Sequence, residues 1–549
     1  MPFKKIEVTR PRGINSDLSP YEMPNELWSN GNNIDFKGAR VNVALGYKRV
    51  LSSSELSIIP KHAVAFRDGS TDYWYYAGDT KIYKTDGTNH NNVTRQPNSV
   101  DVDYAPEFNI TYDSDGTTVL SKARQHNGWT SDVFNGALLL NNGYDLPQVY
   151  DDVAGKMIDL TAWPSTDKCG VLRPFKNYLV ALDITESSNR RPTMVRWSDT
   201  APLGDVPQSW SAVDASSQAG YNILPDTQGQ VVDGKALGDT FFIYKNDAVW
   251  AMQFIGGNFV FSFRKVFNDA GILAKDCVAE YDNKHFVVGV DDVYVHDGTT
   301  KKSVISNKMH DFFYNDIDTE HVSKVRCVAN NSRKEMIIYY PNSSSEDGVA
   351  NTAITWNWES DSWSKRDIGN VSHITTGIVA LDGTDTRQWG ADTDTTTWEG
   401  STGVWDSQTY NPAVESLVYI TQGGLASSSN FNLGNTGVNI VTTGASPVSY
   451  ESFVEREGID FGDDKGYKYV HAIYPHMVGE GTIKIYVGTE EFQGGGISWS
   501  EPQEFVVGQD YKVNFRKSGR YIAVRFESEG GTLWGLTGYS MEYSFEGRQ

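Results

Sequence analysis

The chain has 549 residues, of which 39% are hydrophobic and 12% are aromatic, and it contains 51 glycines. This length and apolar content exclude a disordered chain and allow one large repeat fold with attached domains. Its 70 acidic residues exceed its 48 basic residues, for a net charge of −22, which argues against tight binding to nucleic-acid phosphates. Because aromatic side chains fit a pleated surface and glycines fit tight turns, we expect an all-β protein.

Cysteine usage and hydropathy narrow the cellular setting. Cys169, Cys277 and Cys327 are far apart and form no CxxC pair, so neither a disulfide framework nor a zinc site is expected. The N-terminus has no apolar signal region, and no stretch approaches eighteen apolar residues, which predicts neither secretion by a signal peptide nor membrane insertion. We expect synthesis in a cytoplasm.

Residues 1–60 are predicted to form an extended N-terminal arm and a first strand. Pro20 and Pro24 oppose continuous regular structure in this segment. Apolar side chains in the arm need burial and are candidate anchors on the rest of the protein or on a neighbouring subunit. These candidate anchors are Leu18, Tyr21, Met23, Leu27 and Trp28.

Residues 61–368 contain six segments with the same strand–turn pattern. In each, strands with alternating apolar residues are separated by turns such as DG and NG. The six segments are 62–87, 132–160, 170–199, 234–266, 277–305 and 322–368. Because a lone sheet of three or four strands cannot bury both faces, repeated sheets packed around an axis explain this pattern. We predict a six-bladed β-propeller; the alternative is a run of hairpins in two sandwiches.

After residue 368 the repeated strand–turn pattern ends. Residues 369–447 are rich in Thr, Gly, Asp and Ser, which predicts a loop-rich connection with extra strands. Alternation resumes after it, for example at Ile483, Ile485 and Val487, so residues 448–549 are predicted to form a C-terminal β-sandwich.

Motifs for catalysis are missing from the sequence. It contains no HExxH, no GxSxG, no P-loop and no dinucleotide-binding fingerprint. A glycosidase needs two carboxylates at a set separation, and the sequence singles out no pair among its acidic residues. We therefore predict no enzyme, no catalytic residue, no cofactor and no metal site.

The opening stretch "RGINSDLSPYEMPNELWSNGNNIDFKGARVNVALGYKRV" resembles the start of tail nozzle or hub proteins (tail tubular protein B-like) of short-tailed bacteriophages. The matching positions are Gly13, Ile14, Pro20, Pro24, Asn33, Phe36, Gly38, Arg40 and Gly46. Residues 195–210 and 511–548 are similar to further segments of that family. The resemblance touches most of the chain as scattered motifs.

The resemblance implies a structural virion protein with a six-bladed propeller and appended β domains. In this family six copies ring the tail axis beneath the adaptor, or head-to-tail connector, and form the distal nozzle through which genomic DNA is ejected. The implied partners are further copies of the chain, the adaptor, and tail fibre, tailspike or needle proteins. Double-stranded DNA would pass through without specific binding.

A channel that releases DNA gains from an acidic wall, because like charges keep the polymer from adhering. Candidate lumen-facing residues on predicted turns are Asp291, Asp292, Asp316, Asp318, Asp392 and Asp394. Two other functions stay open at this point: a propeller tail protein that binds or cleaves host surface glycans, and a cellular propeller scaffold. Fold alone does not separate them.

Overall fold

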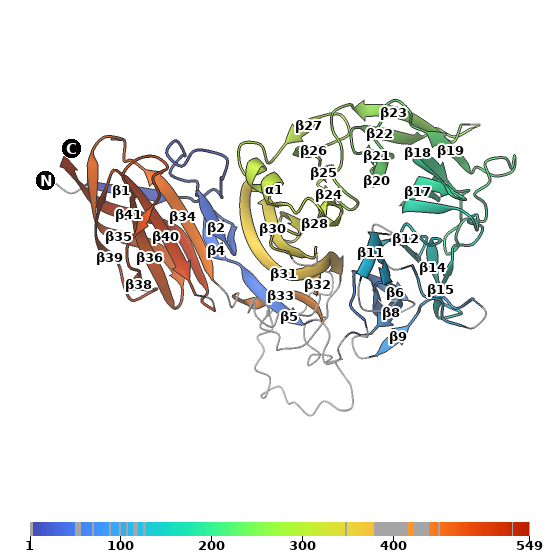
Figure 1. Ribbon diagram of the computed structural model, residues 1–549, viewed down its shortest axis with the longest axis horizontal. Helices are drawn as coiled ribbons and strands as arrows, with labels where there is room; N and C mark the ends of the chain where they lie inside the picture. Colours follow the sequence, from blue (N-terminus) through green and yellow to red (C-terminus); the bar gives the residue numbers. More distant parts are fainter. Residues whose placement is uncertain are drawn as a thin grey trace, which may run out of the picture.

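The computed structural model describes residues 4–49, 56, 58–68, 71–86, 89–97, 100–105, 108–112, 119–124, 128–257, 259–345, 348–377, 416–421, 439–447, 451–529 and 531–547. The chain is all-β, as predicted. Figure 1 shows antiparallel sheets grouped around a common centre, with a separate layered group of strands beside them that carries both chain ends. None of the helices in the described ranges has the length and apolarity needed to cross a membrane.

Five sheets have four antiparallel strands each, in chain order. Their strands are β6 (His62–Asp68), β7 (Thr71–Ala77), β8 (Ile82–Thr85) and β9 (His90–Asn92); β12 (Thr130–Phe134), β13 (Ala137–Asn141), β14 (Gln148–Asp151) and β15 (Lys156–Asp159); β16 (Lys168–Phe175), β17 (Tyr178–Glu186), β18 (Asn189–Trp197) and β19 (Gly220–Ile223); β20 (Val231–Leu237), β21 (Thr240–Lys245), β22 (Val249–Phe254) and β23 (Phe261–Phe267); and β24 (Val278–Tyr281), β25 (Lys284–Val288), β26 (Val293–His296) and β27 (Lys301–Ser303). Each of these sheets overlaps one of the first five predicted repeat segments, but β9 and β19 lie beyond the predicted ends at 87 and 199.

Short elements connect these sheets. A hairpin of β10 (Phe108–Tyr112) and β11 (Val119–Arg124) stands between the first two sheets in the chain. The helix α1 (His310–Asp316) and the 3-10 turn η2 (Val322–Lys324) follow the fifth sheet.

The next sheet has seven strands in the order β28-β29-β30-β31-β32-β33-β5. Its strands are β28 (Arg326–Asn330), β29 (Glu335–Tyr340), β30 (Ala350–Asn357), β31 (Ser362–Gly377), β32 (Ser416–Thr421), β33 (Asn439–Pro447) and β5 (Leu45–Arg49). Val371 marks a change of partner within β31, because the residues before it pair with β30 and those after it pair with β32. Buried side chains of β29 and β30 share one cluster with those of β31 and β32, so the two halves of this sheet face each other.

Apolar clusters join each sheet to the next along the chain. The sheet of β6–β9 shares a buried cluster with β13–β15. The sheet of β12–β15 shares another with β16–β18. A third cluster joins β16–β18 to β20–β23. A larger cluster continues through β24–β27 to β28–β30. The second half of the seven-stranded sheet then packs on β6 and β7 through β32. The core is therefore a series of layers between sheet faces.

Two six-stranded sheets form the C-terminal sandwich. One contains β1 (Lys4–Thr9), β3 (Ile34–Phe36), β4 (Val41–Val43), β35 (Tyr467–Gly479), β39 (Val513–Gly519) and β41 (Trp534–Gly547). The other contains β2 (Asn30–Asn32), β34 (Ser452–Ile459), β36 (Thr482–Glu490), β37 (Ser498–Trp499), β38 (Gln503–Val506) and β40 (Tyr521–Ser528).

The segment expected to be an extended arm differs from that expectation. Its strands β1 to β4 complete the two sandwich sheets of the same chain, and β5 forms the edge of the seven-stranded sheet. The sequence pattern hid these strands because β2, β3 and β4 have three residues each, too few for an alternation to stand out. Much of the predicted connection, 369–447, lies outside the described residues; its described parts are the end of β31, β32 and β33.

Candidate functional site: a polar belt between the sheets

A cavity of about 490 Å³ lies where the first strands of the sheets converge. Its wall takes residues from β6, β12, β16, β20, β24 and β28, and from the second half of β31. Both charge signs line it: Asp132, Asp276 and Glu280 are acidic, and Arg173 and Lys235 are basic. The centre of this chain is thus polar, with its charges mixed.

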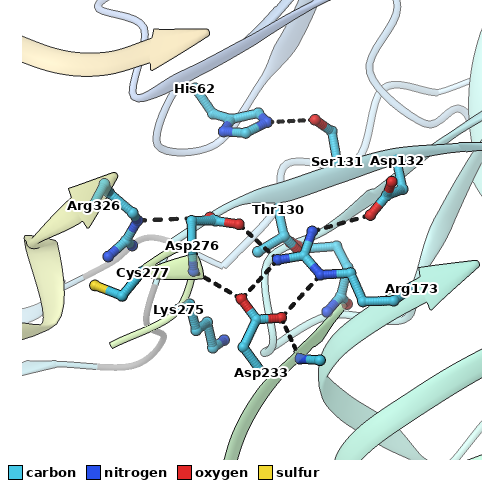
Figure 2. Close-up of polar contacts among 12 residues, drawn as sticks. His62, Thr130, Ser131, Asp132, Arg173, Asp233, Lys275, Asp276, Cys277 and Arg326 are labelled. Carbon is cyan, nitrogen blue, oxygen red and sulfur yellow. Dashed lines mark hydrogen bonds and ion pairs between the residues drawn. The ribbon is translucent and has the colours of Figure 1, made fainter. Parts of the chain in front are cut away.

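Arg173 on β16 is the hub of the polar contacts at this cavity (Figure 2). Its Nε and Nη2 donate to the two carboxylate oxygens of Asp233, each at 2.9 Å. Nη1 donates to Asp132 Oδ2 at 3.0 Å, and Nη2 also donates to Asp276 Oδ1 at 2.6 Å. Because the three aspartates belong to or adjoin β12, β20 and β24, one guanidinium ties four successive sheets together.

Further contacts extend this arrangement to the neighbouring sheet. The backbone N–H of Asp276 donates to Asp233 Oδ2 at 2.8 Å, and Nε of Arg326 on β28 lies 3.6 Å from Asp276 Oδ2. The backbone N–H of Cys327 donates to the carbonyl of Asp276 at 2.9 Å. Asp276 therefore links β20, β24 and β28.

The belt continues on its other side through two histidines. His62, the first residue of β6, places Nε2 2.7 Å from Ser131 Oγ on β12. Its ring centroid lies 4.2 Å from that of His373 on β31, and the hydroxyl of Tyr339 on β29 lies 3.4 Å from His373 Nδ1. We call His62, Ser131, Asp132, Arg173, Asp233, Asp276, Arg326, Tyr339 and His373 the central belt.

The electrostatics of the central belt follow from burial and pairing. Burial alone would raise the pKa of Asp276, but the charges of Arg173 and Arg326 outweigh it and hold that pKa well below its usual range. Burial raises the pKa of Asp132 despite the opposing effect of Arg173. Burial lowers the pKa of His62 well below its usual value and that of His373 to about 4, so both rings are neutral at pH 7.

The residues of the central belt hold neighbouring strands together. Arg173 binds all three aspartates, so none of them is an unengaged acid or base of the kind that glycoside hydrolysis needs. Among the described residues, no group of three His, Cys, Asp or Glu side chains is arranged to hold a metal ion. The three thiols are buried.

A second polar cluster joins the sandwich to the seven-stranded sheet. Asp35 on β3 accepts a hydrogen bond from Arg366 Nε at 2.9 Å and another from Arg333 Nη2 at 2.8 Å. Asn33 accepts from the backbone N–H of Asp367 at 3.0 Å and donates to the carbonyl of Glu451 at 2.9 Å. We call Asn33, Asp35, Arg333, Arg366 and Asp367 the junction.

The five candidate anchors do not share one environment. Trp28 is buried against Phe526 and Tyr539, and Met23 is buried as well. Tyr21 is partly buried; its hydroxyl donates to Glu490 Oε2 at 2.8 Å. Leu27 is partly buried.

Leu18 is 38% exposed, so it is not an anchor within this chain. Its segment instead turns through polar contacts, in which the backbone N–H of Leu18 donates to Asn15 Oδ1 at 2.9 Å. A turn held by its own polar groups does not need the leucine side chain for burial.

Two of the predicted acidic pairs lie near α1. Asp291 is exposed, and its carbonyl lies 2.8 Å from His310 Nε2 at the start of that helix. Asp292 accepts from Ser303 Oγ at 2.7 Å. At the other end of the helix, Asp316 accepts from the Tyr340 hydroxyl at 2.9 Å, and Asp318 Oδ2 lies 2.6 Å from His321 Nδ1. Asp392 and Asp394 lie outside the described residues.

The sequence predictions missed the central belt, although a signal for it is present. His62, Asp132, Arg173, Asp233 and Asp276 each lie at, or within a few residues of, the start of a predicted repeat segment. A polar residue at the same place in successive repeats indicates side chains that meet at a common centre. No protein-family model matches this chain, and no curated protein matches it.

Proposed function

We propose that this chain is a structural protein of a short-tailed phage virion, where several copies form the distal nozzle through which genomic DNA is ejected. The proposal begins from the resemblance of its N-terminal stretch to tail nozzle proteins. It includes six copies in a ring, contact with the adaptor and with fibre, tailspike or needle proteins, and no catalytic turnover.

The observation that carries the proposal is the conformation of the residues behind that resemblance. Three of the matching positions, Gly13, Asn33 and Gly38, have positive φ angles of 123°, 57° and 62°. Such backbone favours glycine and tolerates asparagine. A Cβ on Gly13 would also stand 3.0 Å from the backbone nitrogen of Trp363. These three motif residues thus suit the backbone they form: Gly13 and Asn33 where the segment meets β31, and Gly38 in the turn between β3 and β4.

We further propose that the grouped sheets are the blades of a propeller. Five four-stranded sheets and the first half of the seven-stranded sheet correspond to the six predicted blades. The change of partner at Val371 supports a seventh blade, made of the second half of β31 with β32, β33 and β5. In this arrangement the N-terminal strand β5 completes a blade begun by later strands, so the edge of β33 is paired.

The central belt bears on where DNA could pass. Arg173, Asp233 and Asp276 fill the convergence of the first strands, and the cavity beside them holds only about 490 Å³. A DNA duplex is far wider than such a cavity. The conduit would therefore be enclosed by several copies of the chain, and each copy would contribute two different patches to close a ring.

Exposed apolar side chains support an assembly of copies. Val153, Leu203, Val213 and Phe259 are 98%, 90%, 94% and 78% exposed. They lie in the connections between the third and fourth strands of three successive sheets, and in antiparallel sheets of equal order these connections emerge at the same end. We propose that these exposed apolar groups, repeated on corresponding connections, contact a neighbouring copy.

Assembly can be tested directly at this surface. Leu203→Asp combined with Val213→Asp should leave the chain folded but prevent association, measured as mass in solution. Tyr511→Asp is the matched control, because Tyr511 is 73% exposed but lies in the sandwich part of the chain. Equal assembly of all three proteins would argue against this surface.

Location in the virion tests the function itself. Gold-labelled antibodies against this chain should decorate the distal end of the tail in phage particles that contain it. Decoration of the capsid alone, or release of reducing sugars from host polysaccharide by the purified protein, would favour another function, the latter being the glycan-cleaving alternative.

The predicted acidic lumen gives a separate test. Asp291 is the best position for it, because it is exposed while Asp292 and Asp316 bind neighbouring hydroxyls. Asp291→Lys should leave assembly intact and slow DNA release, with a larger effect at low salt, where screening is weaker. Unchanged release at every salt concentration would exclude the electrostatic role and leave the ring.

A further inference from the structure

The contact between β6 and the second half of β31 joins the first of the grouped sheets to the last one in chain order. Within the described ranges, these two sheets meet through side chains, without a backbone–backbone hydrogen bond between them. An apolar cluster that includes Trp74 and Ile420 joins them, and Ser372 Oγ donates to the carbonyl of Pro60 at 2.8 Å. The third element of the contact is the pair of rings, His62 and His373.

Both rings face the cavity, and their centroids are 4.2 Å apart. Titratable or charged groups face this cavity from the elements packed around it: Asp132 on β12, Arg173 on β16, Lys235 on β20, Asp276 before β24, Glu280 on β24, Arg326 on β28 and Tyr339 on β29. Three of these are cationic. Of the carboxylates, Asp132 and Asp276 are already bound to Arg173, and Glu280 is exposed, so that water screens its charge.

We propose that His62 and His373 form a proton-sensitive latch, which holds β6 against β31 while both rings are neutral and opens this one contact when they are protonated. Two imidazolium rings at this separation repel each other; Arg326 repels both rings and Arg173 repels His62, whereas Asp276 attracts both. Opening lets the rings reach water, where each takes up a proton at ordinary acidity.

The number of protons taken up determines how the opening constant of the β6–β31 contact depends on pH. In the closed state burial holds the pKa of His373 to about 4 and that of His62 well below its usual value. In the open state both should titrate near 6.5. Opening then takes up two protons, so the opening constant should rise about a hundredfold for each pH unit below about 6.5.

Hydrogen exchange of the full-length protein can measure this dependence. Peptides covering 62–68 and 371–377 are followed from pH 7.5 to pH 4.5, with labelling times corrected for the intrinsic exchange rate. The wild type should show the two-proton slope there, while peptides from β35 and β40 in the sandwich stay protected.

Variants separate the latch from general acid sensitivity. His62→Gln or His373→Gln should lower the slope to about tenfold per pH unit, and the double variant should remove it. His471→Gln in β35 should keep the full slope, as should His285→Gln, since His285 lies outside this contact. An equal loss of slope in His285→Gln would show that the chain unfolds as a whole.

The wild type alone can overturn the proposal even if a variant does not fold. Exchange in 62–68 and 371–377 that is independent of pH, or that rises only together with the sandwich peptides, contradicts a local latch. This result would leave the proposed virion function untouched, because the latch is argued from the contact between β6 and β31 and not from the ring.

Discussion

Asp35 and Arg366 are 331 residues apart in the sequence, and Nε of Arg366 donates to Asp35 Oδ1 at 2.9 Å in a buried pair. This contact joins the sandwich strand β3 to β31 of the seven-stranded sheet. Arg333 donates to the other carboxylate oxygen at 2.8 Å. One carboxylate from the N-terminal segment thus bridges two arginines, and Glu335 Oε1, 3.3 Å from Arg333 Nε, supplies the second negative charge.

Replacing this carboxylate should destabilise the protein strongly. Asp35→Asn removes the carboxylate that Arg366 binds in the core, and breaking a buried pair in this way costs about 3–5 kcal/mol of unfolding free energy. Denaturant titration measures the loss. Asp239→Asn is the control, because Asp239 pairs with Lys176 while 95% exposed, and it should leave the unfolding free energy nearly unchanged. Equal losses would contradict a structural role of the junction.

Arg173→Met tests the central belt. The variant leaves three carboxylates without their shared cation, and we expect a loss of about 3–5 kcal/mol at pH 8. In the variant the carboxylate pKa values rise above their unfolded values, so the folded state binds protons as the pH falls. The difference in unfolding free energy between Arg173→Met and wild type should therefore be smaller at pH 5 than at pH 8.

The matched control for the belt is Arg191→Met, because Arg191 is 52% exposed at its ion pair with Glu186. It should change the unfolding free energy by less than about 1 kcal/mol at either pH. A gap between Arg173→Met and wild type that widens at pH 5 would contradict the carboxylate explanation.

Packing of the N-terminal segment is tested at Trp28. Trp28 is 1% exposed and contacts Phe526 and Tyr539, so Trp28→Ala should cost about 3–5 kcal/mol through the cavity it leaves. Leu18→Ala should change stability by less than about 0.5 kcal/mol, because Leu18 is 38% exposed and is not part of a buried apolar cluster among the described residues. Thermal and denaturant unfolding of both variants measures the difference, and a reversed order would contradict the packing.

A chain of hydrogen bonds around Tyr244 makes stability depend on pH. The backbone N–H of Gly298 donates to His296 Nδ1, so neutral His296 donates from Nε2 to the Tyr244 hydroxyl at 2.7 Å. Tyr244 donates to His285 Nδ1 at 2.6 Å, and His285 Nε2 donates to the carbonyl of Ala236 at 3.0 Å. Every donor and acceptor is used only while both rings are neutral.

Burial lowers the pKa of His296 to about 4 and, together with the charge of His296, lowers that of His285 to about 3. Because these folded-state pKa values lie below the unfolded value, their stabilisation is present above about pH 6.5 and is lost as the pH falls toward 4. Glu455 has the opposite effect on stability. Burial and Glu457 raise its pKa to about 8, so its contribution to stability is lost as the pH rises toward 8.

A single substitution isolates the contribution of His296. His296→Gln should make the unfolding free energy less steep by about 1.4 kcal/mol per pH unit between pH 6 and 4.5. His471→Gln serves as the control and should keep the wild-type steepness. An identical pH profile in His296→Gln and wild type would contradict the neutral chain of hydrogen bonds.

Local sequence patterns predicted strands and hairpins, but not the contacts between segments that are far apart in the chain. The sheet of β20–β23 was predictable because alternation and short turns occur within one continuous segment. The pairing of β1 with β41, which places Lys4 opposite Tyr543, joins the two chain ends, and no local pattern encodes it. Arg173 was missed for the same reason, because its partners Asp132, Asp233 and Asp276 lie in other repeats.

The most direct test of the proposed function is cryo-electron microscopy of virions that contain this chain. The account predicts a ring of six copies at the distal end of the tail, with DNA passing between the copies and no DNA density through the central belt of any one copy. A single copy on the tail axis, a chain found only outside the tail, or DNA density through the convergence of β16, β20 and β24 would contradict it.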